Sequence, residues 1–203
     1  MKDNKRMANT YEIVHAIHIG DMEIVFGENL KEPNGLFYFV GNYTANELFG
    51  SYDNNKIGDN FLEMIQEFIG RVQKQIEFVK SEQQKVKIPL DIFTPNQCYP
   101  NDLSKNIEGK IMALRPEVLR NEYRTADRQI WIVLGGFGAQ ANSRGSACFS
   151  INIYSGKESR WERQDFMGEI KPECLPEWSK ERLATIQKER KEKQKKPLSR
   201  EER

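Results

Sequence analysis

The chain has 203 residues, of which 38% are hydrophobic and 30% charged, and its 31 basic residues nearly balance 30 acidic ones. This length suits one mid-sized domain or two small ones with a buried core, and a net charge of +1 gives no sign of general polyanion binding. Every apolar run is shorter than the ~18 residues that span a bilayer, and residues 1–10 lack the apolar segment of a signal peptide. We therefore expect a cytoplasmic protein with no membrane association.

Cysteine spacing and charge distribution add two further expectations. The cysteines show no CxxC spacing, which favours reduced thiols over a disulfide framework or a zinc site. Residues 1–85 carry 9 basic and 13 acidic residues, a net charge of −4, and residues 181–203 carry 9 and 5, a net charge of +4. An acidic first half is thus followed by a basic C-terminus. The cysteines are Cys98, Cys148 and Cys174.

The first half of the chain predicts a sheet covered by a helix. Residues 11–26 predict two strands around a Gly-Asp turn, and residues 36–45 predict a third. Residues 50–60 are polar and predict a loop, with Asp59 as the N-cap of a helix that ends near residue 84. Apolar residues at spacings of three and four give that helix one apolar face: Phe61, Ile65, Phe68, Val72, Ile76 and Val79.

The second half predicts a β-rich unit with a terminal helix, after a linker over 86–100 that contains three prolines. The expected fold class is therefore α+β: an N-terminal antiparallel sheet with one long helix over 1–85, and a mainly antiparallel β unit over 101–187. The basic tail, 188–203, has almost no apolar residue, and we expect it to be disordered. The strand patterns cover 110–119, 129–137, 146–154 and 159–170, and a helix is expected over about 176–195.

The stretch LGGFGAQANSRGSACFS, residues 134–150, is glycine-rich but does not match a phosphate-binding motif. No lysine follows the glycines, and the residues after them alternate like a strand rather than starting a helix. Two interpretations remain open. The glycines supply the positive φ angles of a hairpin, or the loop presents Asn142, Ser143 and Arg144 for binding.

Two histidines and two carboxylates lie close together in sequence at His15, His18, Asp21 and Glu23. Such a set is suited to metal binding or acid–base chemistry. On a strand, however, His15 and His18 point to opposite faces, so we expect structural histidines, no metal and no cofactor. The enzyme interpretation stays open only as an alternative, with these four residues as its catalytic candidates.

Arginines are frequent between residues 115 and 163, with tryptophans among them. Guanidinium groups pair with phosphate or carboxylate and stack on aromatic rings, which favours a nucleic-acid or protein interface. Solvated charge balanced by nearby carboxylates is the alternative. The binding candidates from this set are Arg124, Arg128, Arg144, Arg160, Arg163 and Trp161.

Several stretches resemble a family of small proteins carried on conjugative elements, plasmids and phages of Gram-positive bacteria. They are TYEIVHAIHIGDMEIVFGE, NQCYPNDLSKNIEGKIMALRPEVL, and the run from EYRTADRQIWIVLGGFGAQANSRGSACFS to LPEWSKERL. The resemblance extends to about Leu183 and includes type II-A anti-CRISPR proteins. It implies an inhibitor that binds a type II CRISPR effector nuclease or its guide-RNA complex.

Under this interpretation, acidic side chains of the first half act as phosphate mimics in the positively charged channel of the effector. The candidates are Asp53, Asp59, Glu63 and Glu67. Two alternatives remain open: a nuclease that truncates guide RNA, and a nucleic-acid-binding accessory protein of conjugative transfer. The sequence determines neither the step of effector action that is inhibited nor the oligomeric state of the protein.

Overall fold

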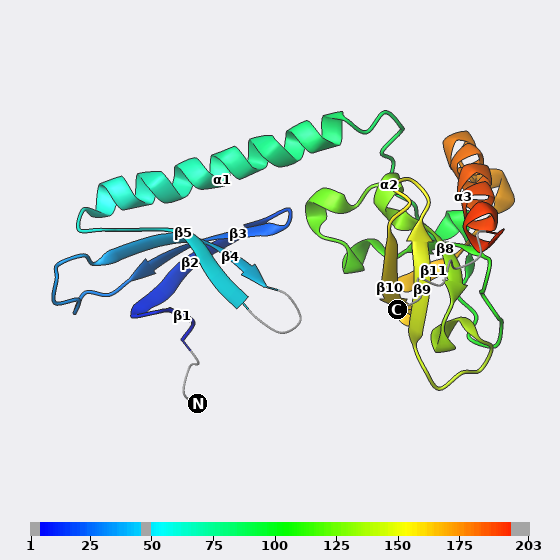
Figure 1. Ribbon diagram of the computed structural model, residues 1–203, viewed down its shortest axis with the longest axis horizontal. Coiled ribbons are helices and arrows are strands. Elements are labelled where there is room, and N and C mark those ends of the chain that lie inside the picture. Colours follow the sequence, from blue (N-terminus) through cyan, green and yellow to red (C-terminus); the bar gives the residue numbers. More distant parts are fainter. Residues whose placement is uncertain (1–4, 46–49, 196–203) are drawn as a thin grey trace, which may run out of the picture. The chain divides into compact units, whose positions relative to one another are not determined.

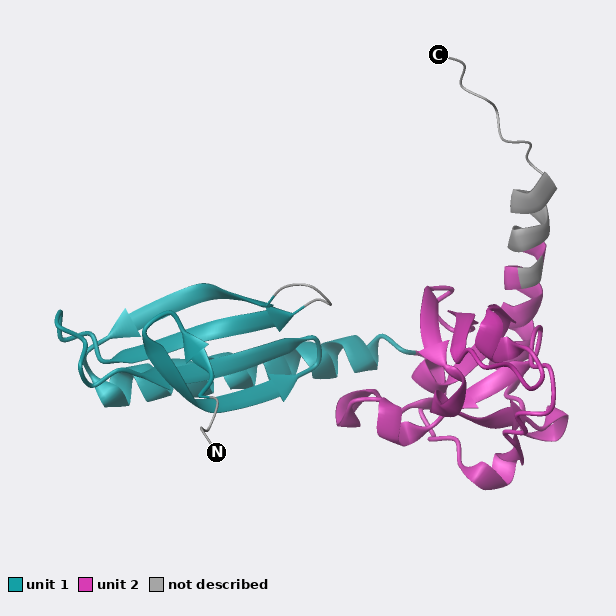
Figure 2. Ribbon diagram, turned by 90° about the horizontal axis from the view of Figure 1, so that it is seen from below, with its two compact units in different colours: residues 1–86 teal, residues 87–203 magenta. Residues whose placement is uncertain are grey.

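The computed structural model describes residues 5–45 and 50–195 (Figure 1). The chain divides into two compact units, Met1–Val86 and Lys87–Arg203 (Figure 2). Within the described residues, no helix combines the length and the apolar character needed to cross a membrane.

Unit 1 is a five-stranded antiparallel sheet in which every strand pairs with its neighbours in the chain. Its strands are Met7–Ala8 (β1), Tyr11–Ile19 (β2), Met22–Glu28 (β3), Tyr38–Ala45 (β4) and Gly50–Gly58 (β5). One helix, Phe61–Gln84 (α1), lies along one face of the sheet (Figure 1). This confirms the expected sheet with one long helix.

The loop predicted over residues 50–60 is wrong, because Gly50–Gly58 forms the strand β5. Its side chains are almost all exposed, so it shows no apolar alternation. It forms a sheet because its backbone pairs with β4 over nearly its whole length. An edge strand that is mostly open to water tolerates polar residues at most positions, and in β5 Tyr52 alone packs on the rings of Phe39 and Tyr43.

The helix α1 is held by one apolar face and a side-chain cap. Phe26 is fully buried under the helix, where Phe61 and Phe68 meet its ring edge-on. The N-cap is Asn60 rather than the predicted Asp59, because the Asn60 Oδ1 accepts hydrogen bonds from the first-turn amides. The prediction of the helix end near residue 84 is confirmed.

The opposite face of the first sheet has its own small core. Tyr11 stacks on Phe39 at a centroid distance of 5.5 Å. Beside them, the Arg6 guanidinium donates two hydrogen bonds to the Glu23 carboxylate, at 2.9 and 2.8 Å, and lies over the Tyr43 ring. The hydrogen bonds from Arg6 to Glu23 are the main reason that the pKa of Arg6 is raised.

Unit 2 contains a six-stranded sheet in the order β10-β9-β8-β7-β11-β6. Its strands are Cys98–Pro100 (β6), Ile111–Leu114 (β7), Ile130–Gly135 (β8), Ala147–Asn152 (β9), Glu158–Glu162 (β10) and Phe166–Ile170 (β11). The segment 159–170 was expected to be one strand, but a 3-10 turn at Arg163–Asp165 interrupts it. The chain therefore leaves the β9 edge at β10 and pairs again as β11, between β7 and β6.

The linker predicted over residues 86–100 is shorter in the structure, because Phe93 and Cys98 already belong to the core of unit 2. Phe93 is buried in the second core, and its backbone N–H and C=O bond to the side chain of the buried Gln129. The strand β6 follows directly, as the edge of the second sheet.

The terminal helix is Glu177–Lys195 (α3), as expected, and Ile186 is buried against the second core. The tail predicted from residue 188 thus begins inside α3. Residues 196–203 of that tail lie outside the described residues.

Candidate functional site

The glycine-rich loop after β8 is a tightly packed turn. A Cβ on Gly138 would lie 2.0 Å from the Ser146 carbonyl oxygen, so only glycine lets the two backbones approach this closely. The Asn142 amide donates to the Leu103 carbonyl at 2.9 Å, and the Ser143 hydroxyl accepts from the Gly145 amide at 3.1 Å. These bonds restrain the loop backbone. The side chains of Asn142, Ser143 and Arg144 are all exposed.

Two phenylalanines are exposed beside this loop. Phe137 is 78% exposed and packs over the backbone of Gly145, where a Cβ would lie 2.6 Å from its own Cβ. Phe149 is 54% exposed on β9, directly opposite Arg160 on β10, so these two side chains share one face of the sheet.

The turn Phe137–Ala139 packs against the start of β9, and the loop that contains Arg144 leads into that strand. Arg160 pairs with Glu162 at 2.6 Å, while Arg144 makes no ion pair with any described residue. We refer to this set as the β9 corner: Phe137, Arg144, Phe149 and Arg160.

Other members of the arginine set serve the fold. The Arg124 Nε donates to the carbonyls of Pro116 and Leu119, at 2.9 and 3.2 Å, and so closes a loop. Arg128 pairs with the buried Asp127 at 3.3 Å and lies over an aromatic ring. Trp161 is half-buried and packs edge-on against Trp131 at a centroid distance of 5.4 Å.

The sequence predicts Arg163 as a binding residue at the surface, and this prediction is wrong. Only 5% of Arg163 is exposed. Its guanidinium bonds to the Asn101 side chain and to the main-chain carbonyls of Asp102, Lys105 and Gly138. Desolvation by burial lowers the pKa of Arg163. This side chain ties two loops together and is not available to a partner.

The acidic candidates of unit 1 are not equivalent. Glu67 is paired with Arg71 at 2.7 Å and with Lys56 at 3.3 Å, and its hydrogen bond from Arg71 is the main cause of its lowered pKa. Its charge is therefore neutralised within the unit. Asp53 on β5, Asp59 and Glu63 are exposed. Glu63 lies in the first turn of α1, where negative charge also stabilises the helix dipole.

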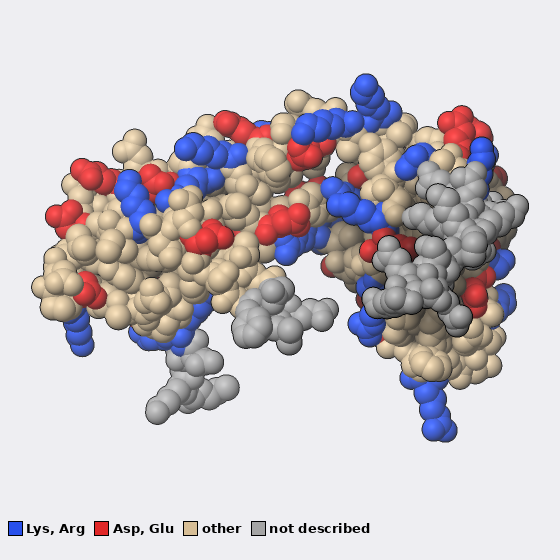
Figure 3. Space-filling view, in the orientation of Figure 1, with Lys and Arg blue, Asp and Glu red and all other residues tan. Residues whose placement is uncertain are grey.

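Charge is dispersed on the face of unit 1 that Figure 3 shows, where acidic side chains lie among basic and uncharged ones. Phosphate mimicry by this unit would therefore depend on Asp53, Asp59 and Glu63 individually, without support from Glu67.

The histidine candidates do not converge on one point. His15 lies opposite Phe26 on the helix side of the sheet, with ring centroids 6.2 Å apart. His18 lies opposite Glu23 on the other side, and the Glu23 carboxylate is bonded to Arg6. Among the described residues, no group of three or more His, Cys, Asp or Glu side chains is arranged to hold a metal ion.

Comparisons with protein-family models, with curated proteins and with solved structures gave no match.

Sequence patterns alone did not identify Phe137 and Phe149 as surface residues of the β9 corner. A signal for one of them was present, because a large apolar residue between two glycines, as in Gly136-Phe137-Gly138, lies in a turn that cannot easily bury it. Phe149 gave no comparable signal, since alternation identified the strand but not which face of it is covered.

Proposed function

We propose that the protein inhibits a type II CRISPR effector nuclease in the cytoplasm by binding the nuclease or its guide-RNA complex, and so blocks cleavage of target DNA. The sequence resemblance suggests this class of activity. The observation that carries the proposal is the β9 corner, which combines two exposed phenylalanines with two exposed arginines on a restrained loop and strand.

This composition is typical of the energetic centre of an interface. Burying an exposed phenylalanine contributes about 1.5–3 kcal/mol, and aromatic residues and arginine are enriched where binding energy concentrates. The loop backbone is restrained, because it is bonded to residue 103 and packed on β9. This lowers the backbone entropy lost on binding.

The charge of the corner indicates what it binds. The Arg144 guanidinium is available to a carboxylate of the effector or a phosphate of the guide RNA. In unit 1, Asp53, Asp59 and Glu63 are free to meet the basic channel that holds the heteroduplex backbone. We assign the principal contact to the β9 corner and a secondary one to these carboxylates.

The test is inhibition of effector cleavage of a plasmid target, measured against protein concentration. The variant Phe137→Ala with Arg144→Glu removes one aromatic ring and reverses one charge. Its matched control is Leu30→Ala with Lys157→Glu, because Leu30 is 69% exposed in a turn and Lys157 is exposed in another. We expect the inhibitory concentration to rise about tenfold or more for the first variant and to stay unchanged for the control.

Equal inhibition by both variants, with unchanged melting, would remove the β9 corner from the interface. Guide RNA shortened by the protein alone would replace inhibition by binding with a nuclease activity. Binding to duplex DNA without the effector, weakening with salt, would favour the accessory role in conjugative transfer.

A further inference from the structure

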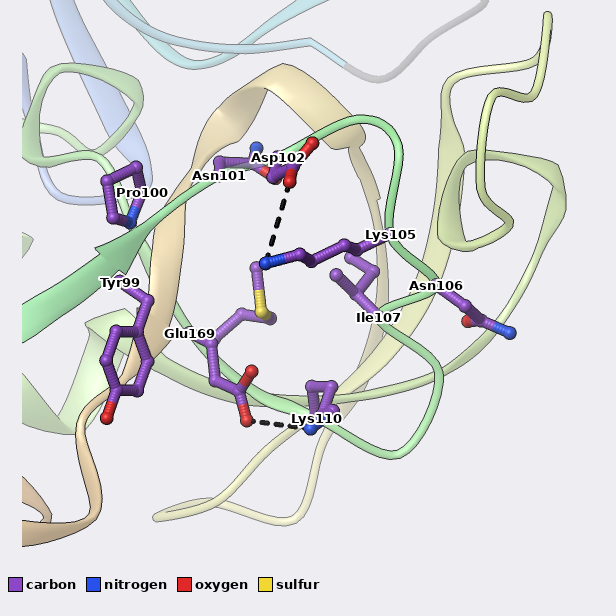
Figure 4. A pocket seen from close by; sticks show the side chains of 10 residues that line it. Tyr99, Pro100, Asn101, Asp102, Lys105, Asn106, Ile107, Lys110 and Glu169 are labelled. Atoms are coloured by element: carbon purple, nitrogen blue, oxygen red, sulfur yellow. Dashed lines mark hydrogen bonds and ion pairs between the residues drawn. The ribbon is translucent and has the colours of Figure 1, made fainter.

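Unit 2 contains a cavity of about 600 Å³ that is separate from the β9 corner. Its floor is a row of cross-strand partners, Tyr99 on β6, Glu169 on β11 and Met112 on β7. The segment from Asn101 to Lys110 forms its wall (Figure 4). This volume is within the roughly 300–1,000 Å³ of small-molecule sites.

The wall of this cavity is preformed. Arg163, buried behind it, donates to the carbonyls of Asp102 and Lys105, at 2.7 and 3.1 Å. The Ile107 amide donates to the Ala139 carbonyl at 2.9 Å. A ligand would therefore meet a fixed wall rather than order a loose one.

Two lysines and two carboxylates surround the cavity as ion pairs. The Lys105 ammonium reaches toward Asp102 at 3.6 Å, and Lys110 pairs with Glu169 at 3.1 Å (Figure 4). The first distance is longer than a hydrogen bond, and Lys105 is 76% exposed. Surface ion pairs of this kind contribute little to stability, so an incoming anion can recruit the lysines at small cost.

Apolar and aromatic surface lies between these charges. Met112 and Ile107 are buried with their edges on the cavity, whereas Tyr99 is 49% exposed and leaves ring surface open. Asn101 is not available to a ligand, because its side chain bonds to Arg163 and to the Phe166 carbonyl.

We propose that this cavity binds a nucleoside monophosphate unit, with the base on the Tyr99 ring and the phosphate on Lys105 and Lys110. The two carboxylates, Asp102 and Glu169, then accept hydrogen bonds from ribose hydroxyls or base amino groups.

A nucleotide accounts for both signs of charge in the cavity. Stacking on an aromatic ring and ionic contact with phosphate are the usual elements of nucleotide binding in single strands. Carboxylates accept from the ribose 2′-hydroxyl and from exocyclic amines in other nucleotide sites. An acidic peptide side chain would engage the lysines but face two carboxylates, and a lone phosphate would leave the Tyr99 ring unused.

The free mononucleotide and a nucleotide within a strand share this chemistry, and the experiment separates them. The full chain is titrated with AMP, CMP, GMP and UMP, and with single-stranded RNA tetramers, followed by NMR shifts of residues 99–112 and by calorimetry. Adenosine, which lacks the phosphate, and inorganic phosphate, which lacks the nucleoside, are the two comparison probes. The variants are Lys105→Ala, Lys110→Ala, Tyr99→Ala and Tyr99→Phe, with Lys157→Ala as the matched surface control.

We expect a nucleotide, free or in a strand, to bind about tenfold or more tightly than adenosine or phosphate. Each alanine variant should weaken nucleotide binding by a similar factor, while Tyr99→Phe and Lys157→Ala retain binding.

Tighter binding of the tetramer than of any mononucleotide would assign the site to a strand, and equal binding would assign it to the free nucleotide. Phosphate binding as tightly as nucleotides, insensitivity to Tyr99→Ala, or no shifts at millimolar ligand would each overturn the proposal. The inference does not depend on the proposed function, since it needs no effector nuclease.

Discussion

Replacing Arg163 with methionine should destabilise unit 2, because the guanidinium is the shared donor for two loops. In the structure it donates to the Asn101 Oδ1 at 2.9 Å, to Gly138 O at 3.1 Å, to Asp102 O at 2.7 Å and to Lys105 O at 3.1 Å. Methionine fills similar space but donates nothing, so these oxygens lose their partner.

The magnitude follows from how buried each acceptor is. The bond to Gly138 is buried and the other three are part-buried. An orphaned buried acceptor costs about 1–3 kcal/mol, and each of the three that water still reaches costs about 0.5–1.5 kcal/mol, giving a total of about 2.5–7.5 kcal/mol. Removing a buried charge returns part of its desolvation penalty. We therefore expect about 3 kcal/mol, a large share of the roughly 5–15 kcal/mol that stabilise a typical protein.

Urea unfolding followed by tryptophan fluorescence measures this loss in unit 2 alone. All three tryptophans of the chain, Trp131, Trp161 and Trp178, belong to that unit. The variant Arg163→Lys keeps the charge without the planar fork and should lose about half as much. Arg160→Met is the control, because Arg160 is exposed and its single ion pair contributes little.

A change within about 0.5 kcal/mol for Arg163→Met, the range of ordinary surface substitutions, would refute the reasoning. The loops would then be held by their backbone contacts alone. A loss as large for Arg160→Met would show that the charge of the sheet edge matters, rather than the buried donors.

Three further predictions concern single groups. Asn60→Ala should speed hydrogen exchange of the first-turn amides of α1 about fivefold, equivalent to about 1 kcal/mol, and equal exchange in the variant and the parent would exclude Asn60 as the cap. Gly138→Ala should cost unit 2 about 2 kcal/mol in urea, because its Cβ meets the backbone of residue 146; unchanged stability would contradict the close approach. Burial raises the pKa of the Cys98 and Cys148 thiols from 9.0 to about 11. The stability that the protonated thiols contribute is therefore complete below pH 9 and is lost as pH rises toward 11. The variant with alanine at both positions should lose less stability than the parent between pH 8 and 10.5, and parallel losses would contradict the shift.

The α+β class was predictable because its main elements have strong local patterns. The apolar spacing of α1 identified a helix whose observed end, Gln84, matches the expected one. The β-branched alternation of β2 and β3 likewise identified two strands and the turn between them.

Elements defined by pairing rather than by composition were not predictable. The strand β5 is mostly polar and exposed, so its pairing with β4 identifies it rather than its composition. The break between β10 and β11 had no local signal either. It arises where Arg163 turns inward to reach carbonyls more than twenty residues away in the sequence.

The candidate site was predictable only as a pool of residue types. The sequence gives no reason to distinguish one arginine from another, whereas in the structure Arg163 is buried and Arg144 is exposed. The cavity was invisible in the sequence, because Tyr99 and Glu169 become neighbours only through the pairing of β6 with β11. Long-range pairing of this kind leaves no periodic trace in either segment.

The strand orders of the two sheets imply different schedules of folding during synthesis. In unit 1 each strand pairs with the one made just before it, so the sheet can form as soon as residue 84 has left the ribosome. In unit 2, β6 is the first of the described strands to be made, and β11, the described strand with which it pairs, is made last. A nascent chain stopped before residue 166 would thus hold a finished first unit beside a second one with an exposed, unpaired strand. The strand β6 can therefore join its sheet only after β11 has been synthesised.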